Sequence, residues 1–283
     1  MKDRPIGIFD SGVGGLTVVD AMTRAFPAES IIYFGDTGRY PYGVRSKKVL
    51  IEFALQIAGF LEDQGCKFII IACNSASAAA LPEVTAAAGV PVIGVVEPGA
   101  QAAVATSRTR RIGVIGTEAT IQSGTYTTAI HRLAPEARVE ARACPLFVAL
   151  AEEGYAGHKV TRIIAEEYLA PFKDDGVDTL VLGCTHYPLL KADIAAVIGP
   201  GVRLVDSAEA VAQAVGAELI GRNHHRETDR AREHQYFVSD TPERFSRVGE
   251  RFLGRPVDPV SVIDLETLAH RRADAVDAPV KRP

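Results

Sequence analysis

Two cysteines, Cys73 and Cys184, lie in similar local sequences that constrain the fold more than any other feature of this chain. Each follows an apolar run, FIIIA before Cys73 and TLVLG before Cys184, and each precedes a stretch typical of a helix. Continuous apolar runs indicate buried parallel strands, and open α/β sheets bind ligands at the carboxyl ends of their strands. Two thiols at two strand ends could therefore act on one small molecule from opposite sides, as a two-base proton transfer requires.

A second pair of matching segments indicates an internal repeat. IGIFDSG at 6–12 resembles IGVIGTE at 112–118, an offset of 106 residues, and the two cysteines are offset by 111 residues. The alternative is a chance similarity between apolar strands, and the agreement of the two offsets argues against it. Because repetition decides the fold class, we expect an α/β fold of two similar lobes. Each lobe should be a mostly parallel sheet flanked by helices, with the active site at the interface.

Alternating strand-like and helix-like segments, among them a helix expected over 118–132, support this fold class. Glu97-Pro98-Gly99 is predicted to be a turn where the chain crosses between the lobes. The strands expected at 235–239 and 260–265 are too short for a third core, so we expect them to complete the first lobe. The predicted division is lobe 1, residues 1–96 and 208–268; lobe 2, residues 97–207; and a disordered tail, residues 269–283, which is polar and contains proline.

Composition excludes several classes of protein. The net charge of −4 and pI of about 6.0 do not fit a nucleic-acid-binding domain. We find neither an apolar stretch long enough for a membrane span nor a signal peptide, and therefore expect a cytoplasmic protein without membrane partners. The cysteine and histidine spacings fit neither a disulfide framework nor a metal site. No lysine among positions 47, 48, 67, 159, 173 and 191 has the setting of a pyridoxal-phosphate Schiff base, so we expect no cofactor.

The turn that starts with Asp10, Ser11 and Gly12 and continues through Gly14 and Gly15 is predicted to bind an anion. A glycine-rich turn at a helix start presents free N–H groups. The dinucleotide and P-loop patterns are both incomplete here, and a carboxylate is therefore the expected guest. Asp10 could orient or deprotonate a neighbouring group, or it could simply cap the helix.

The residues after the two cysteines also suit an anionic ligand. Asn74-Ser75 and Thr185-His186 each place side-chain donors at a helix start. The same position is expected to lower a cysteine pKa toward a usable thiolate. The alternative for any cysteine is a small buried apolar residue, and this is our interpretation of Cys66 and Cys144.

Three other segments carry weaker signals. The loop at 37–43, which contains Tyr42 and Gly43, is either a ligand clamp or an ordinary turn. Glu152 could face the site, but from its position alone it is more typical of a solvated helix carboxylate. The polar segment at 222–233, with His224 and His225, is predicted to be an exposed loop or frayed helix.

Five motifs together resemble glutamate racemase, in order and across residues 6 to about 265: FDSGVGGLTV, YFGDTGRYPYG, ACNSAS, VIGTEATIQSG and LGCTHYPLL. The resemblance implies two α/β lobes and cofactor-independent interconversion of L- and D-glutamate for peptidoglycan synthesis, in an enzyme that is a homodimer. It implies that Cys73 and Cys184 are the acid/base pair, that Asp10 supports Cys73, and that His186 and Glu152 support Cys184. The substrate-binding residues that it implies are Asp10, Ser11, Tyr42, Gly43, Asn74, Ser75, Thr185 and His186.

The sequence does not distinguish this function from three others. A racemase for aspartate or another acidic amino acid would share both cysteine motifs. A regulatory protein could sense an acidic amino acid or inhibit a partner without using the cysteines. A redox-sensing dithiol would require the two sulfurs to approach bonding distance.

Overall fold

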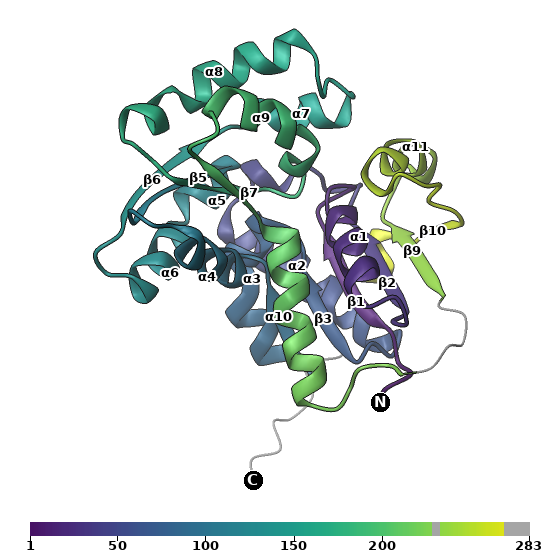
Figure 1. Ribbon diagram of the computed structural model, residues 1–283. Helices are drawn as coiled ribbons and strands as arrows, with labels where there is room; N and C mark the ends of the chain where they lie inside the picture. Colours follow the sequence, from purple (N-terminus) through teal and green to yellow (C-terminus); the bar gives the residue numbers. More distant parts are fainter. Residues whose placement is uncertain (228–232, 269–283) are drawn as a thin grey trace.

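The computed structural model describes residues 1–227 and 233–268 and contains two parallel sheets flanked by helices (Figure 1). The first sheet has the strand order β10-β9-β2-β1-β3-β4, with β1 (Ile6–Asp10), β2 (Ile31–Gly35), β3 (Phe68–Ile71), β4 (Val92–Gly94), β9 (His234–Val238) and β10 (Val260–Val262). The second has the order β6-β5-β7-β8, with β5 (Arg111–Gly116), β6 (Arg138–Ala143), β7 (Thr179–Gly183) and β8 (Arg203–Asp206). Every pair of neighbouring strands is parallel.

The two sheets share one topology, which confirms the predicted pair of similar lobes. β2-β1-β3-β4 in the first sheet corresponds to β6-β5-β7-β8 in the second, so β1 matches β5 and β3 matches β7. These are the four strands that the sequence repeat identified. Cys73 and Cys184 follow β3 and β7, each beside the central strand of its sheet.

Helices cover both faces of each sheet. They are α1 (Leu16–Ala25), α2 (Lys47–Asp63), α3 (Asn74–Ala87), α4 (Val96–Thr106), α5 (Glu118–Gln122), α6 (Thr125–Leu133), α7 (Leu146–Glu152), α8 (Lys159–Asp174), α9 (Lys191–Ile198), α10 (Ser207–Gly221) and α11 (Pro242–Leu253), with the short 3₁₀ turns η1 (Tyr42–Val44) and η2 (Tyr187–Leu190). Among the described residues, no helix is both long and apolar enough to cross a membrane.

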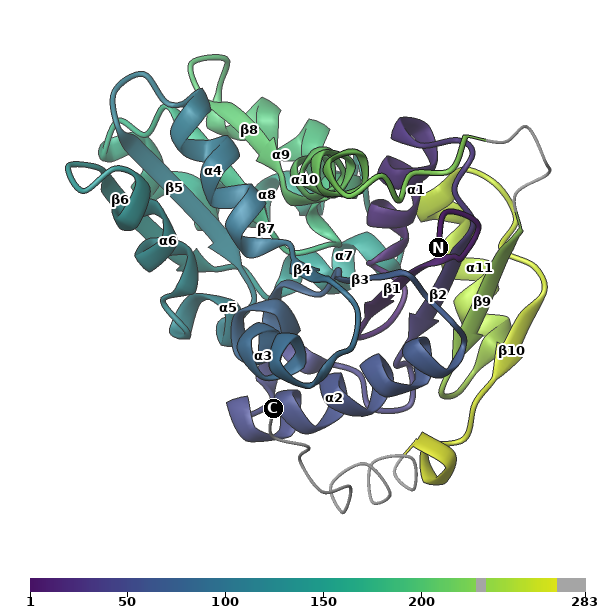
Figure 2. The same ribbon diagram turned by 90° about the horizontal axis from the view of Figure 1, so that it is seen from below.

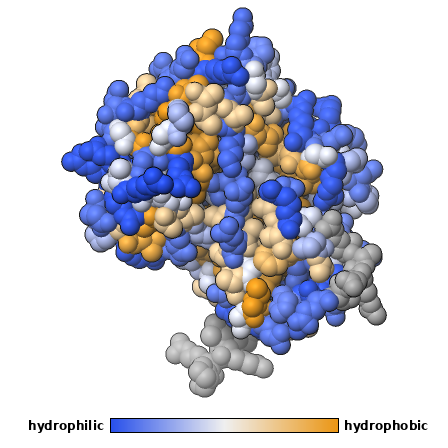
Figure 3. Space-filling view, in the orientation of Figure 1, coloured by the Kyte–Doolittle hydropathy of each residue, from blue (hydrophilic) through white to orange (hydrophobic). Residues whose placement is uncertain are grey.

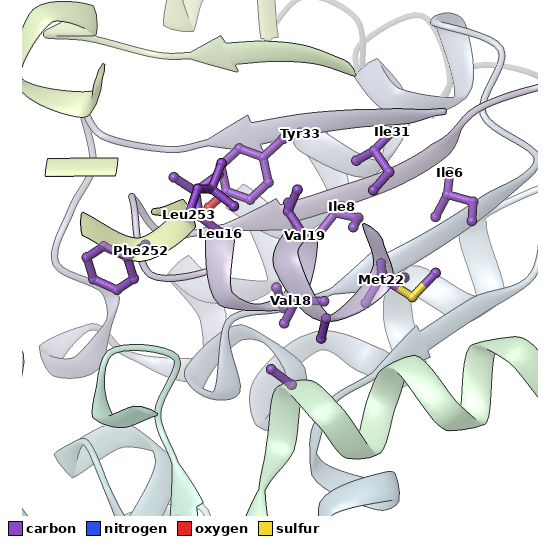
Figure 4. Packing of buried hydrophobic residues seen from close by; sticks show 14 of the residues in the cluster. Ile6, Ile8, Leu16, Val18, Val19, Met22, Ile31, Tyr33, Phe252 and Leu253 are labelled. Atoms are coloured by element: carbon purple, nitrogen blue, oxygen red, sulfur yellow. The ribbon is translucent and has the colours of Figure 1, made fainter. Parts of the chain in front are cut away.

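Burial on both faces explains the continuous apolar run of β1. Ile6 and Ile8 pack with residues of α1, α10 and α11, such as Leu16 and Met22 (Figure 4), whereas Phe9 enters the opposite cluster with α2 and α3. The second sheet is arranged alike, with α7, α8 and α9 on one face and α4 and α6 on the other. Such strands need apolar residues at successive positions, not alternate ones.

The last described part of the chain joins the first sheet, where β9 pairs with β2 and β10 with β9. α10 contributes side chains to the first lobe's core and packs between α1 and α4 (Figure 2). We therefore propose that lobe 1 comprises residues 1–96 and 208–268, and lobe 2 residues 97–207. The predicted tail at 269–283 lies outside the described residues.

Three local predictions differ from the structure. Glu97-Pro98-Gly99 is not a turn but lies in the first turn of α4, where proline's missing N–H has no intrahelical partner to lose. The helix expected over 118–132 is divided into α5 and α6 at Gly124, whose φ is +64°. His224 and His225 are half-buried rather than on the open surface. The His224 carbonyl accepts a hydrogen bond from the buried ammonium of Lys67 at 2.8 Å.

The molecular surface mixes polar and apolar side chains. Hydrophilic residues are interspersed with apolar ones on the face seen in Figure 3. Isolated exposed apolar side chains are normal on a protein surface and do not by themselves mark a functional site.

Candidate active site

A cavity of about 350 Å³ lies where residues following β1, β3, β5 and β7 meet, and both predicted cysteines line it. The strands of each sheet are parallel, so their carboxyl ends share one edge, and the two edges face each other here. The predicted site residues that line the cavity are Ser11, Tyr42, Gly43, Cys73, Asn74, Ser75, Glu152, Cys184, Thr185 and His186. Asp10 lies behind this lining, fully buried.

Cys73 immediately precedes α3 and is 5% exposed. The structure contradicts the expected low pKa of this thiol. Burial and then the nearby Asp10 carboxyl raise the pKa of Cys73 to about 12, although hydrogen bonds from the Ala76 N–H and the Ser11 hydroxyl oppose the rise. Cys73 therefore carries its proton in this arrangement.

Asp10 ends β1 and holds the glycine turn that follows. Its Oδ2 accepts a hydrogen bond from the Gly12 N–H at 3.0 Å, and its Oδ1 accepts one from the Thr185 hydroxyl of the other lobe at 3.4 Å. Burial raises the pKa of Asp10, and the charge of His186 opposes this rise. The N-cap of α1 is Gly15 and not Asp10, so the structure does not support a simple helix-capping role.

Cys184 belongs to a chain of contacts within lobe 2. Its Sγ lies 3.8 Å from Nδ1 of His186, and Nε2 of His186 lies 3.0 Å from Oε1 of Glu152. The expectation from position alone that Glu152 is solvated is wrong, because α7 ends at this residue, which lines the cavity and is only 8% exposed as a whole. Arg244 reaches it from α11 and donates to its Oε2 at 2.9 Å.

The contacts of His186 and Glu152 favour the charged form of both. Burial works against the imidazolium, but hydrogen bonds and charge interactions with Cys184 and Glu152 raise the pKa of His186 to about 10. Burial likewise works against the carboxylate, but His186, then Tyr40 and Arg244, together hold the pKa of Glu152 below its usual range. Positive charge therefore lies beside the sulfur of Cys184, whereas a carboxyl lies near Cys73.

Amide and hydroxyl groups from both lobes provide donors in the same cavity. Asn74 Oδ1 accepts a hydrogen bond from the Tyr126 hydroxyl at 2.7 Å, while its buried Nδ2 has no hydrogen-bond partner among the described residues. Ser75 Oγ lies 2.8 Å from Oγ1 of Thr117 across the interface. An unpartnered buried donor is costly, and a ligand carboxylate would satisfy it.

The loop at 37–43 is held firmly by a buried carboxylate. Asp36 accepts hydrogen bonds from the Tyr42 hydroxyl, from Nε of Arg39 at 2.7 Å, and from the Ser239 hydroxyl at 2.7 Å. Tyr42 and Gly43 then form one wall of the cavity. This geometry supports the ligand-clamp interpretation over that of an ordinary turn.

Sequence reasoning did not identify Tyr40, Thr117 and Arg244, which also line the cavity. Thr117 could have been found, because the offset of 106 residues between the repeats pairs it with Ser11. Tyr40 lies in the loop that was singled out, and no sequence signal marked it apart from its neighbours. Arg244 comes from α11, which belongs to neither repeat, and no local sequence pattern connects it with the site.

Within residues 1–227 and 233–268, no three His, Cys, Asp or Glu side chains are grouped in a way that could hold a metal ion. The cavity and the residues directly behind it bring together two thiols, an imidazole, an arginine, and several carboxyl and hydroxyl groups. This set can remove and return a proton on a small anionic molecule.

The sequence model of the family described as Asp/Glu/Hydantoin racemase matches residues 6–215. The chain belongs to this racemase family. It is accordingly an isomerase that acts on amino acids, and the predicted resemblance is confirmed. The racemase is 51% identical to a glutamate racemase from Geobacter metallireducens over 266 residues, which cover 94% of this chain and 98% of that protein. It is 52% identical to a glutamate racemase from Syntrophus aciditrophicus over 262 residues, covering 92% and 97% of the two chains.

Solved structures of glutamate racemases share the fold of this racemase. One from Bacillus anthracis superposes with a TM-score of 0.90 at 37% identity, covering 94% of this chain and 99% of that one. Another, from Francisella tularensis in complex with D-glutamate, superposes with a TM-score of 0.88 at 39% identity, covering 94% and 100%. An aspartate racemase from Picrophilus torridus has a TM-score of 0.58 at 17% identity, which shows a common fold only.

Proposed function

We propose that this racemase interconverts L- and D-glutamate, without a cofactor, by moving the Cα proton between Cys73 and Cys184. The observation that carries the proposal is the placement of these thiols after equivalent strands of two lobes, both facing one cavity. Racemisation removes a proton from one face of Cα and returns one to the other. A single base would have to cross the molecular plane, whereas two opposed thiols need not.

The proton balance follows from the two sulfurs. One thiolate takes the Cα proton and becomes a thiol, and the electron pair left on Cα takes a proton from the other thiol, which becomes a thiolate. The enzyme therefore ends each turnover in the opposite protonation state. Asp10 acts near Cys73, while His186, supported by Glu152, acts beside Cys184. General acid–base assistance of this kind contributes roughly 10²- to 10⁴-fold in rate.

The substrate class follows from the polar groups of the cavity. Asn74, Ser75 and Thr185 offer donors at helix starts, which suit carboxylates. Ser11, Tyr42 and Gly43 complete the proposed binding residues. The glutamate assignment is supported by the similarity to relatives named glutamate racemase and to a structure that holds D-glutamate. By the same resemblance we propose a cytoplasmic homodimer that supplies D-glutamate for peptidoglycan synthesis.

The test is loss of the Cα proton to deuterated water, measured by NMR for each glutamate enantiomer with dialysed, chelator-treated protein. We expect both enantiomers to exchange and to converge on a racemic mixture, with aspartate much slower. Activity that returned only with added pyridoxal phosphate or a metal would contradict the cofactor-free mechanism. Equal or faster turnover of aspartate would favour the alternative substrate. No exchange with either amino acid would favour a binding or redox role, and full racemase activity after both cysteines are replaced by serine would contradict the two-cysteine mechanism.

A further inference from the structure

Two arginines of α11 hold Glu152 at both its side chain and its backbone. Arg244 Nη2 donates to Oε2 of Glu152 at 2.9 Å, and Arg251 Nη1 donates to the Glu152 carbonyl oxygen at 2.5 Å. Residues seven apart lie on one face of a helix, roughly 10 Å apart along its axis. Gly154 leaves room for the Arg251 side chain, because a Cβ at position 154 would lie only 3.0 Å from Nη1 of Arg251. The φ of Gly154 is +78°, which also favours glycine. α11, yellow-green in Figure 1, thus contacts the end of α7.

Glu152 divides its two oxygens between two positive partners. Oε1 meets His186 in lobe 2, and Oε2 meets Arg244 of α11. The Glu152 side chain is 10% exposed, and that of Arg244 is 48% exposed. Tyr40, which also hydrogen-bonds the carboxylate, is the third titratable group facing it, and Glu153 lies 3.7 Å from Arg244.

We propose that Arg244 is a positioning residue for the Cys184 half of the reaction: by fixing Glu152 it holds His186 against Cys184. The proposal rests on the two-cysteine function given above. Without Arg244, Oε2 would lose its charged partner and the carboxylate could rotate away from Nε2 of His186. The imidazolium would then be less stabilised beside the sulfur of Cys184.

The effect should be one-sided, because within the described residues no side chain of α11 hydrogen-bonds a group that acts on Cys73. The groups that act on Cys73 are Asp10 and Ser11 of the β1–α1 turn, the Ala76 N–H and Cys184 itself. A purely structural role for Arg244 would instead weaken the interface and slow both half-reactions alike.

Overall racemisation cannot reveal a one-sided effect. Because L- and D-glutamate have equal free energies in water, kcat/KM must stay equal in the two directions in every variant. A glutamate analogue with chlorine on Cβ avoids this limit. Once the Cα proton has been abstracted, the carbanion expels chloride, so elimination needs only the abstraction step. Elimination from each enantiomer therefore reports one cysteine, and the Cys73→Ser and Cys184→Ser variants assign which.

The experiment compares Arg244→Gln and Arg244→Lys with Arg247→Gln, an exposed arginine on the same helix. Half-exposed ion pairs are modest in strength. We therefore expect Arg244→Gln to slow elimination from the enantiomer served by Cys184 by about 3- to 10-fold, and from the other by less than about twofold. Arg244→Lys should recover part of the loss and Arg247→Gln should show none. The acid limb of the Cys184-dependent elimination should also move to higher pH in Arg244→Gln, because the pKa of Glu152 rises when the cation is removed.

Equal losses for the two enantiomers, or no loss in either Arg244 variant, would overturn the proposal while leaving the two-cysteine function intact. A different set of results would contradict the proposed function itself. If wild-type protein eliminated from neither enantiomer, or if the two serine variants did not divide the enantiomers between them, the proposed function would be wrong and the role of Arg244 would fall with it.

Discussion

Cys73 and Cys184 occupy equivalent places in the two lobes but have electrostatically opposite neighbours. Asp10, near Cys73, is paired by the repeat with Gly116, so the second lobe has no carboxyl at the matching position. It has instead an imidazole two residues after its cysteine, held by Glu152. A carboxyl disfavours a thiolate and an imidazolium favours one. In the proposed mechanism the surroundings of the two thiols are therefore asymmetric, and Cys73 carries its proton in the resting enzyme.

The raised pKa of His186 predicts a pH-dependent contribution to stability. Its ordinary value is 6.5, and its folded value is about 10. The stabilisation is therefore fully present below about pH 6.5 and is lost as the pH rises toward 10. Urea denaturation at about pH 6, 8 and 10 should show the free energy of unfolding falling more steeply for wild-type protein than for His186→Gln. His131→Gln, at an exposed histidine, should follow the wild type. Parallel curves for wild type and His186→Gln would show that the imidazole is not charged in the folded state.

At the scale of elements, the β1–α1 turn lets the two lobes meet. A Cβ on Gly14 would lie 2.3 Å from Oγ1 of Thr185 and 2.6 Å from Nδ1 of His186. Glycine is thus required here by the close approach of the residues after β7. The turn that supports Cys73 and the segment that carries Cys184 are in direct contact at this point.

Gly14→Ala should accordingly reduce kcat/KM by about 10²-fold, the order expected when catalytic groups are displaced by about 1 Å. The matched control is Gly59→Ala in α2, where an added Cβ would meet no atom within 4 Å. This control should keep full activity and gain roughly 0.5–1 kcal/mol in free energy of unfolding. Racemase assays and denaturation curves of the two variants provide the comparison. Activity in Gly14→Ala close to that of the control would mean that the lobes can separate here without cost.

The parts of the site that could be predicted from sequence are those coded by consecutive residues. Apolar runs buried on both faces identify β3 and β7, and the residues that follow them must lie at the sheet edge. The pKa of Cys73 was mispredicted because burial, which depends on distant segments, outweighs the local helix start. Arg244 was missed for a related reason, since it contacts a residue 92 positions away in the chain.

At the scale of the whole molecule, two sheets that share a four-strand order enclose a cavity between them. The repeat predicted this arrangement because each lobe contains the same succession of strand, turn and cysteine. The return of the chain to form β9 and β10 was expected only because the leftover segments were too short for another core. Since the cavity wall is shared, a ligand that binds there contacts both lobes.

Ligand binding should therefore stabilise the whole chain. A ligand at a hundred times its Kd raises the free energy of unfolding by about 2.7 kcal/mol. We expect either enantiomer of glutamate to raise the thermal unfolding midpoint, and aspartate, which is one methylene shorter, to raise it less at equal concentration. Asn74→Ala should reduce the shift, because the unpartnered amide Nδ2 is lost. A shift as large with aspartate as with glutamate would count against glutamate as the preferred ligand.

The central claim is that each thiol serves one face of Cα, and elimination from the Cβ-chloro analogue of glutamate tests it most directly. With Cys184→Ser, racemisation should collapse while elimination persists from one enantiomer of the analogue, since Cys73 remains to take the proton. With Cys73→Ser, elimination should persist from the opposite enantiomer only. If both variants eliminated from the same enantiomer, or one variant from both, a single mobile base would replace the two-cysteine mechanism.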